Sequence, residues 1–121
     1  MSHTIFERAG GFASVRRIVS AFYDRVLESE MLQGYFVNTD FATLIDHQTK
    51  FIASMMGGPA SFPDEVIRRA HLGLGITPRE FREMADILKD TLLDHGVVPS
   101  DAEQVHAEVL KREPLVVARA A

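Results

Sequence analysis

Apolar residues recur every three or four positions along most of this sequence, a spacing that places them on one side of an α-helix. The pattern predicts a helix over 13–29, entered just after a pair of glycines. It predicts another from residue 41 onward, with Thr39 or Asp40 as its N-cap and the glycine-proline run at 57–59 as its end. No stretch alternates between apolar and polar residues as a half-buried strand does. The fold class that we expect is all-α.

The segment 62–75 predicts a shorter helix. Pro63 suits its first turn, because the fixed φ of proline matches a helix and its missing N–H would have no partner there. Gly73 and Gly75 should stop this helix, since glycine readily leaves the helical conformation.

Two further helices carry capping-box spacing, in which a hydroxyl residue precedes a glutamate by three positions. Thr77 and Glu80 open the clearest helix of the sequence, over 77–96. Ser100 and Glu103 have the same spacing at the start of the last helix. Pro114 should end or bend that helix, because proline disrupts a helix interior.

Composition limits the class of protein. The 121 residues suit one domain over 1–121, with 46% hydrophobic and 25% charged residues. No apolar run approaches the roughly 18 residues of a membrane span, and the N-terminal ten residues lack the apolar core of a signal peptide. We therefore expect no membrane span and a cytoplasmic location.

Charge and cysteine content exclude other classes of function. The net charge is −4, and the thirteen lysines and arginines are spread along the chain, so we expect no nucleic-acid partner. The absence of cysteine excludes disulfides, thiolate metal sites and a cysteine nucleophile.

Three polar side chains stand where a helical bundle should be apolar. Gln48 projects from the middle of the apolar stripe of its helix, and Tyr23 lies on the apolar side of the helix over 13–29. His71 stands four residues after Ile67 and three before Leu74, so it also faces inward. Each could be a core residue with an ordinary hydrogen-bond partner, or could point at a bound ligand. The spacing alone leaves both possibilities open.

His71 is the candidate metal ligand, because imidazole is a common protein ligand for iron. Metal sites made of protein ligands alone usually need three or four of them, and no second histidine stands three or four positions away. A cofactor that carries its own in-plane ligands needs only one. Haem is such a cofactor, and its second face stays open to a gas.

Five short segments stand in a distinctive order and spacing: FYDRVL at 22–27, LQGYF at 32–36, LIDHQTKF at 44–51, GGP at 57–59 and AHLGLGIT at 70–77. Together they resemble the truncated haemoglobins, or two-over-two globins, and most closely their first group. The resemblance runs from Phe22 to Thr77 without a gap and continues to about Pro99. It implies a two-over-two helical sandwich around haem b.

The resemblance also implies roles for single residues. His71 corresponds to the proximal iron ligand, and Tyr23 and Gln48 correspond to the distal residues that hydrogen-bond the bound gas. Leu44 matches the usual distal-gate position. Haem-contacting positions fall on Phe36, Phe51, Ile67, Leu74, Ile76, Phe81 and Met84. Met84 stands where the second and third groups keep a tryptophan.

His47 has two possible roles. Its position is often lysine in the family, where it reaches a haem propionate, but some members have a histidine there that binds iron as a sixth ligand. The helical angle places His47 about 100° round from Gln48, at the flank of the apolar stripe, which favours a propionate or solvent role. Arg68 or Arg69 is a further candidate for a place near a propionate.

Three functions remain open. The first is reversible binding of dioxygen, nitric oxide, carbon monoxide or other diatomic gases. The second is a nitric oxide dioxygenase, which would need a separate reductase because this chain contains no flavin or nicotinamide module. The third is a helical interaction module without haem. Enzyme activity is left undecided by the sequence.

Overall fold

The computed structural model describes residues 3–59 and 62–117, and these residues form helices and connecting loops without a strand. The all-α prediction is confirmed. The elements along the described chain are α1 (Ile5–Arg8), α2 (Gly11–Glu28), the 3-10 helix η1 (Gln33–Phe36), α3 (Phe41–Met55), α4 (Asp64–His71), α5 (Pro78–Asp94), α6 (Pro99–Lys111) and α7 (Glu113–Val116). None of the described helices has the length and apolar character that crossing a membrane requires.

Side-chain caps begin two of the long helices. Before α3, the Asp40 carboxylate accepts a hydrogen bond from the Thr43 backbone N–H at 3.4 Å. Before α5, the Thr77 N–H donates to Glu80 Oε1 at 2.9 Å, and the Glu80 N–H donates to Thr77 Oγ1 at 3.1 Å. Both caps agree with the sequence prediction, because such caps depend on local spacing alone.

The predicted capping box of Ser100 and Glu103 is wrong. α6 begins at Pro99, with Val98 as its N-cap and no side-chain cap. Ser100 therefore lies within the first helical turn instead of preceding it. Pro99 explains the shift, because proline is favoured at the first position of a helix.

The prediction that Pro63 belongs to the first turn of a helix is also wrong. This residue is the N-cap of α4 and has an extended backbone, with ψ at 148°, so that the helix starts at Asp64. At the other end of the chain, α6 stops at Lys111, three residues before Pro114. The chain then resumes as α7, with Pro114 in its first turn.

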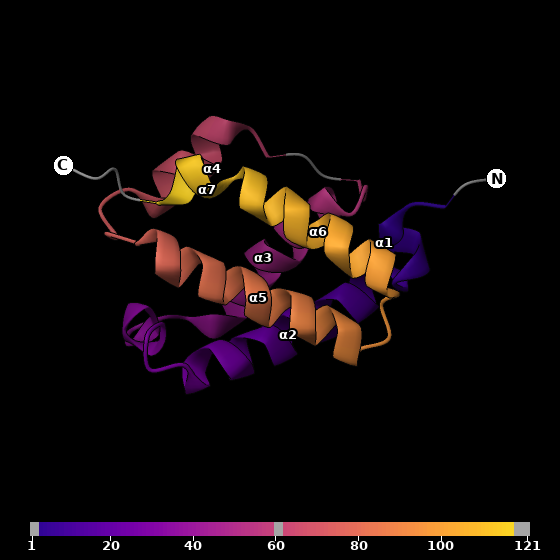
Figure 1. The fold of residues 1–121 in the computed structure, drawn as a ribbon, viewed down its shortest axis with the longest axis horizontal. Helices are drawn as coiled ribbons and strands as arrows, with labels where there is room; N and C mark the ends of the chain where they lie inside the picture. The colour runs from indigo at the N-terminus through magenta and orange to yellow at the C-terminus, as the bar shows by residue number, and fades with distance from the viewer. Residues whose placement is uncertain (1–2, 60–61, 118–121) are drawn as a thin grey trace.

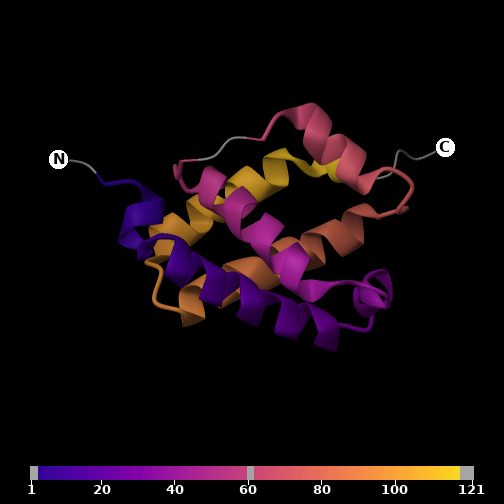
Figure 2. The ribbon, with the colours of Figure 1, turned by 180° about the vertical axis from the view of Figure 1, so that it is seen from behind.

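The helices pack in two layers. α2 and α3 pack against each other, as do α5 and α6, and α2 also contacts α5. Figure 1 shows α5 and α6 in front, and Figure 2 shows α2 and α3 in front when the molecule is turned by 180°. α4 and α7 lie side by side at one end of the two layers. The most enclosed apolar side chains between the layers include Val15, Val19, Val26, Phe81, Leu92 and Val105.

Glycines permit the sharp turn at the end of α3. Gly57 has a φ of 85°, which side chains other than glycine rarely adopt. A Cβ on Gly58 would lie 2.8 Å from the Ala53 carbonyl oxygen and 3.1 Å from the Phe6 ring. Glycine at both positions therefore lets α3 end against α1, and the Phe6 N–H donates to the Met56 carbonyl at 3.0 Å.

Ion pairs join elements that are distant in sequence. Arg8 of α1 donates through Nε and Nη2 to both carboxylate oxygens of Asp101 in α6, at 2.9 and 2.8 Å. Arg25 of α2 donates to Asp94 of α5 at 2.6 Å. The first pair is the more enclosed, since Asp101 is only 7% exposed, and it fixes the short N-terminal helix on the second layer.

Candidate functional site

A cavity of about 650 Å³ lies between α2, α3, α4 and α5, with further walls from η1, α6 and α7. This volume is in the range of cofactor and small-molecule sites. Apart from Arg68 and Arg69, the candidate site residues from the sequence all line this one cavity: Tyr23, Phe36, Leu44, His47, Gln48, Phe51, Ile67, His71, Leu74, Ile76, Phe81 and Met84. The structure therefore brings together residues that stand up to 61 positions apart in the chain, from Tyr23 to Met84.

His71 is the last residue of α4 and is half-buried. Its ring Nδ1 lies 2.7 Å from the carbonyl oxygen of Ile67, one helical turn earlier. Because a carbonyl only accepts hydrogen bonds, Nδ1 carries a proton, and in the neutral ring Nε2 keeps its lone pair. A hydrogen bond of this kind fixes the tautomer and the ring orientation of a metal-binding histidine. The residues that the structure describes contain no group of three or more His, Asp or Glu side chains that could share a metal ion.

Tyr23 is held deep in α2, with only 5% of the residue exposed. Its ring packs edge-to-face on Phe22 at 4.9 Å and on Phe36 at 5.7 Å between centroids. No described residue forms a hydrogen bond with its hydroxyl group. Burial raises the pKa of Tyr23 above its ordinary value, so the hydroxyl stays protonated at neutral pH and can act as a donor.

Gln48 is half-buried in the middle of α3 and lines the same cavity. Within residues 3–59 and 62–117, its amide forms no hydrogen bond with the protein. A buried side-chain amide is normally paired. Tyr23 and Gln48 therefore offer two free donors to a ligand in the cavity, and neither is explained as an ordinary core residue with a protein partner.

The apolar residues that line the cavity differ in how far they are buried. Ile67 and Phe81 are 5% and 2% exposed and form the base of the cavity, whereas Leu74 is 47% exposed and lies at its rim. Phe36 and Leu44 are half-buried. Phe36 also packs on Phe41, with centroids 6.1 Å apart, so that the aromatic rings beside Tyr23 support one another.

His47 lies at the rim of the cavity. It belongs to the lining but is exposed to solvent, as expected for a residue at the flank of the α3 stripe. Its neighbour Asp46 forms an ion pair with Arg16 of α2. This pair ties the outer side of α3 to α2 beside His47.

Sequence reasoning missed a hydrogen bond that crosses the cavity wall. The Tyr35 hydroxyl of η1 donates to Glu80 Oε1 of α5 at 2.7 Å, and both residues line the cavity. Burial, followed by the hydrogen bond to Glu80, raises the pKa of Tyr35 to about 12. The sequence predicted Glu80 only as a helix cap, because its contact with Tyr35 spans 45 residues.

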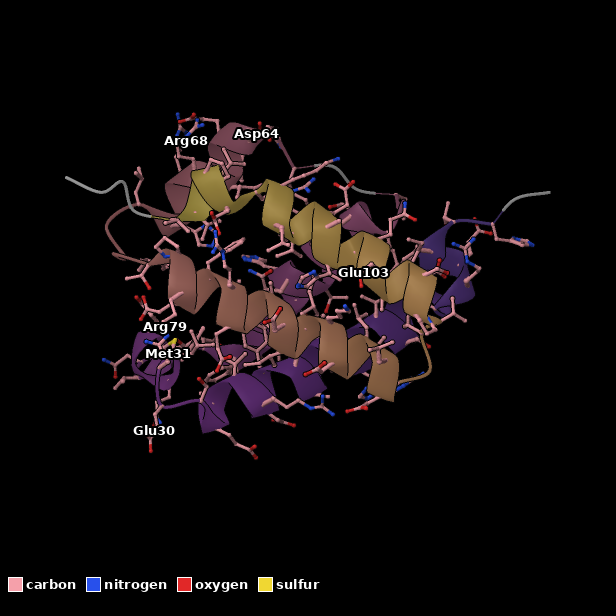
Figure 3. The ribbon with its side chains drawn as sticks, viewed as in Figure 1. Glu30, Met31, Asp64, Arg68, Arg79 and Glu103 are labelled. Carbon is pink, nitrogen blue, oxygen red and sulfur yellow. The ribbon has the colours of Figure 1, made fainter. Side chains whose placement is uncertain are left out.

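The basic side chains that line the cavity differ from those that the sequence suggested. Arg68 and Arg69 do not line it; they pair with Glu65 at 3.0 and 3.3 Å on the outer side of α4. Figure 3 shows Arg68 pointing outward, away from the two layers. Lys50 and Arg112 line the cavity instead. Spacing could have indicated Lys50, which follows His47 by three positions, but Arg112 stands outside every predicted motif.

Comparison with known proteins identifies relatives over nearly the whole chain. The family model of the bacterial-like globins matches residues 4–114. A group 1 truncated haemoglobin, GlbN of Mycolicibacterium paratuberculosis, is 32% identical over 111 residues, which cover 92% of this chain and 82% of the relative. A group 1 truncated haemoglobin of Synechocystis is also 32% identical, over 81% of this chain and 82% of the relative.

Solved structures have the same fold. The two-over-two haemoglobin of Synechococcus sp. PCC 7002, crystallised with covalently attached haem, has a TM-score of 0.87 and 32% identity, covering 97% of this chain and 100% of the other. The truncated haemoglobin of Tetrahymena pyriformis in its ferric form has a TM-score of 0.85 and 27% identity, with the same coverage. The chain thus shares the two-over-two arrangement of these proteins.

Proposed function

Because the chain belongs to the bacterial-like globin family, as a truncated haemoglobin, we propose that it binds dioxygen reversibly at a haem b held by His71. The observation that supports this most is a cavity with a free imidazole Nε2 and two free hydrogen-bond donors, from Tyr23 and Gln48. We propose that nitric oxide and carbon monoxide occupy the same place. When bound, haem would supply an iron that binds a diatomic gas.

His71 supplies the ligating nitrogen. The hydrogen bond from Nδ1 to the Ile67 carbonyl holds the ring in one tautomer, with the Nε2 lone pair available. The same hydrogen bond increases the basicity of the ring as a ligand.

Tyr23 and Gln48 stabilise the bound gas. Dioxygen that accepts electron density becomes partly negative, and a phenol and an amide can then donate hydrogen bonds to it. The surrounding aromatic and aliphatic walls exclude water, which strengthens these bonds. Each bond should contribute up to about 1.5 kcal/mol, which corresponds to about a tenfold slower loss of the gas.

We propose that the haem is held without a covalent bond to the protein. The Synechococcus relative was crystallised with covalently attached haem, but this chain has no cysteine, and the lining imidazoles are those of His47 and His71. His71 is assigned to the metal, and His47 is exposed at the rim. Extraction with acidified organic solvent tests this point, because haem b leaves the protein and a covalently attached haem stays with it.

Reversible gas binding is tested by spectroscopy on the purified protein. We expect a strong Soret band and a ferrous form that takes up and releases oxygen as the oxygen pressure is changed. If the purified protein shows no Soret band of bound haem even after haem is added, this result would favour a helical interaction module without haem.

Nitric oxide dioxygenase activity is the second candidate, because Tyr23 and Gln48 would also orient a bound oxygen toward nitric oxide. It requires a separate reductase, which a cytoplasmic location would provide. Stopped-flow mixing of the oxygenated protein with nitric oxide, followed by turnover with a reductase, separates the two functions. Sustained nitrate formation supports the enzyme, whereas a single oxidation without turnover supports reversible binding.

A further inference from the structure

Arg112 lies in the turn between α6 and α7, and its side chain is 27% exposed. Its Nη1 donates to the Glu108 carbonyl at 2.7 Å and to Glu108 Oε2 at 3.1 Å. Its Nε is buried and has no hydrogen-bond partner. Among the described side-chain nitrogen and oxygen atoms that have almost no accessible surface, this Nε alone lacks a partner.

An unpaired donor on a charged group is costly, because burial removes the water that would otherwise bind it. Arg112 also belongs to the lining of the cavity. A ligand in that cavity is therefore the natural source of the missing acceptor.

The guanidinium group is held in place from two sides. Its carbon lies 5.9 Å from the centroid of the Phe51 ring, over the face of that ring. Glu108 fixes the Nη1 end by two hydrogen bonds. A planar, stacked guanidinium loses little freedom when it binds a carboxylate, so a carboxylate in the cavity would be bound at a small cost in side-chain entropy.

The charges around the cavity favour an anionic ligand. Lys50 and Arg112 bring two permanent positive charges to the lining. The carboxylate in the lining belongs to Glu80, and it already accepts hydrogen bonds from the Tyr35 hydroxyl and the Thr77 N–H. Glu108 neutralises part of the Arg112 charge but leaves the Nε–H free.

We propose that Arg112 binds a propionate carboxylate of haem through its Nε–H. The proposal rests on haem binding as described above, and it adds an anchor contributed by the turn between α6 and α7. Haem carries two carboxylates, and hydrogen bonds between arginine and carboxylate are among the stronger ones in proteins. Phe51 and Glu108 are positioning residues for the guanidinium.

The test compares two porphyrins in the full-length protein. The protein is loaded with haem or with haem dimethyl ester, whose propionates are esterified and carry no charge. The rate of porphyrin loss to an excess of a competing apoglobin is then measured for each. We expect the wild type to lose haem more slowly than it loses the ester. In Arg112→Gln, the ratio of the ester loss rate to the haem loss rate should be about tenfold smaller than in the wild type.

The matched control is Lys111→Gln. Lys111 is the preceding residue, it is 71% exposed, and it pairs with the same Glu108, but it does not line the cavity. This variant removes the same charge and should keep the wild-type preference for haem. Arg112→Lys retains a charge but not the Nε–H. Its ratio of ester loss rate to haem loss rate should therefore lie between those of the wild type and Arg112→Gln.

Two results would overturn the proposal. Equal acceleration of the loss of both porphyrins by Arg112→Gln would mean that Arg112 only packs on Phe51. An unchanged preference in both Arg112 variants would mean that another group binds the propionate. A wild-type protein that takes up neither porphyrin would contradict the proposed function itself, which is a separate outcome.

Discussion

Single atoms without a protein partner distinguish the cavity residues from an ordinary helical core. His71 has a fixed Nδ1–H and a free Nε2, while Tyr23 and Gln48 form no side-chain hydrogen bond within residues 3–59 and 62–117. Tyr23 is buried, and Gln48 and His71 are half-buried. Three polar side chains with free hydrogen-bonding atoms around one cavity indicate ligand binding more strongly than any one of them would.

Replacing His71 with alanine should abolish stable haem retention, because no other imidazole in the lining has its orienting hydrogen bond. The measurement is the ratio of Soret to protein absorbance after purification and gel filtration. His95→Ala is a matched control: His95 Nδ1 also contacts the carbonyl one turn earlier, Thr91, at 3.0 Å, but His95 does not line the cavity. A native-like ferrous spectrum of His71→Ala without added imidazole would contradict the assignment.

Removing either distal donor should raise the oxygen dissociation rate constant about tenfold, the effect of losing about one hydrogen bond. Tyr23→Phe keeps the ring and its aromatic contacts, so its effect reports the hydroxyl alone. Gln48→Leu keeps the approximate volume of the side chain. The rates are measured by stopped-flow displacement of oxygen, and unchanged rates in both variants would show that the donors point elsewhere.

The effect of Tyr23 should also be insensitive to pH around neutrality. Burial raises the pKa of this phenol, so it remains a donor throughout the neutral and mildly alkaline range.

His47 should not bind the iron, because it is exposed at the rim of the cavity. To reach the centre of the cavity it would have to turn α3 and displace Leu44 or Gln48 from the apolar side. Wild type and His47→Ala should therefore show the same five-coordinate, high-spin ferrous spectrum from mildly acidic to mildly alkaline pH. A low-spin, six-coordinate spectrum that is lost in His47→Ala would establish internal ligation instead.

At the scale of helices, long elements were predictable because each carries its own signals. The apolar stripes of α2, α3 and α5 repeat over several turns, and the caps at Asp40 and Thr77 depend on neighbouring residues. α1, η1 and α7 contain four residues each, too few for a periodic pattern. Their conformations depend on tertiary contacts, such as the hydrogen bond between Phe6 and Met56 that holds α1 against the end of α3.

The Arg8–Asp101 ion pair should make the docking of α1 depend on pH. The hydrogen bonds from Arg8 lower the pKa of Asp101 below its ordinary value. A carboxyl whose pKa is lower in the folded state stabilises the fold above its unfolded pKa and loses this contribution as the pH falls through its folded pKa. Arg8→Gln should therefore lower the thermal unfolding temperature at neutral pH, and the difference from wild type should shrink below about pH 4.

Asp101→Asn tests the assignment of this pH dependence. It removes the ionisable group while leaving an amide of similar size. In this background, Arg8→Gln should therefore lower the thermal unfolding temperature only slightly at any pH. Two variants whose effects simply add at neutral pH would show that the residues do not act as a pair.

At the scale of the whole molecule, the sequence located most of the cavity but not how it is closed. Tyr23, Gln48 and His71 lie within three of the five segments that carry the family resemblance, so the resemblance could propose roles for them. Tyr35, Glu80 and Arg112 join the cavity only after helices far apart in sequence have packed together. No periodicity or local spacing indicates such contacts, and none indicated that Arg68 and Arg69 lie outside the cavity lining.

The Tyr35–Glu80 hydrogen bond should slow haem loss, because it joins η1 on one side of the cavity to the first turn of α5 on the other. Tyr35→Phe keeps the ring, and Glu80→Ala removes the acceptor oxygen together with its contribution to the α5 cap. We expect Tyr35→Phe to increase the rate of haem transfer to a competing apoglobin severalfold, up to about tenfold for one lost hydrogen bond.

A double-mutant cycle separates this connection from local effects on either element. If the hydrogen bond joins the two sides, Tyr35→Phe should accelerate haem loss much less in a Glu80→Ala background than in the wild type, because the acceptor oxygen is already absent. The oxygen dissociation rate of Tyr35→Phe should change far less than that of Tyr23→Phe, since the Tyr35 hydroxyl is already occupied by Glu80. Equal acceleration in both backgrounds would mean that Tyr35 acts through its own packing and that the cavity is closed by other contacts.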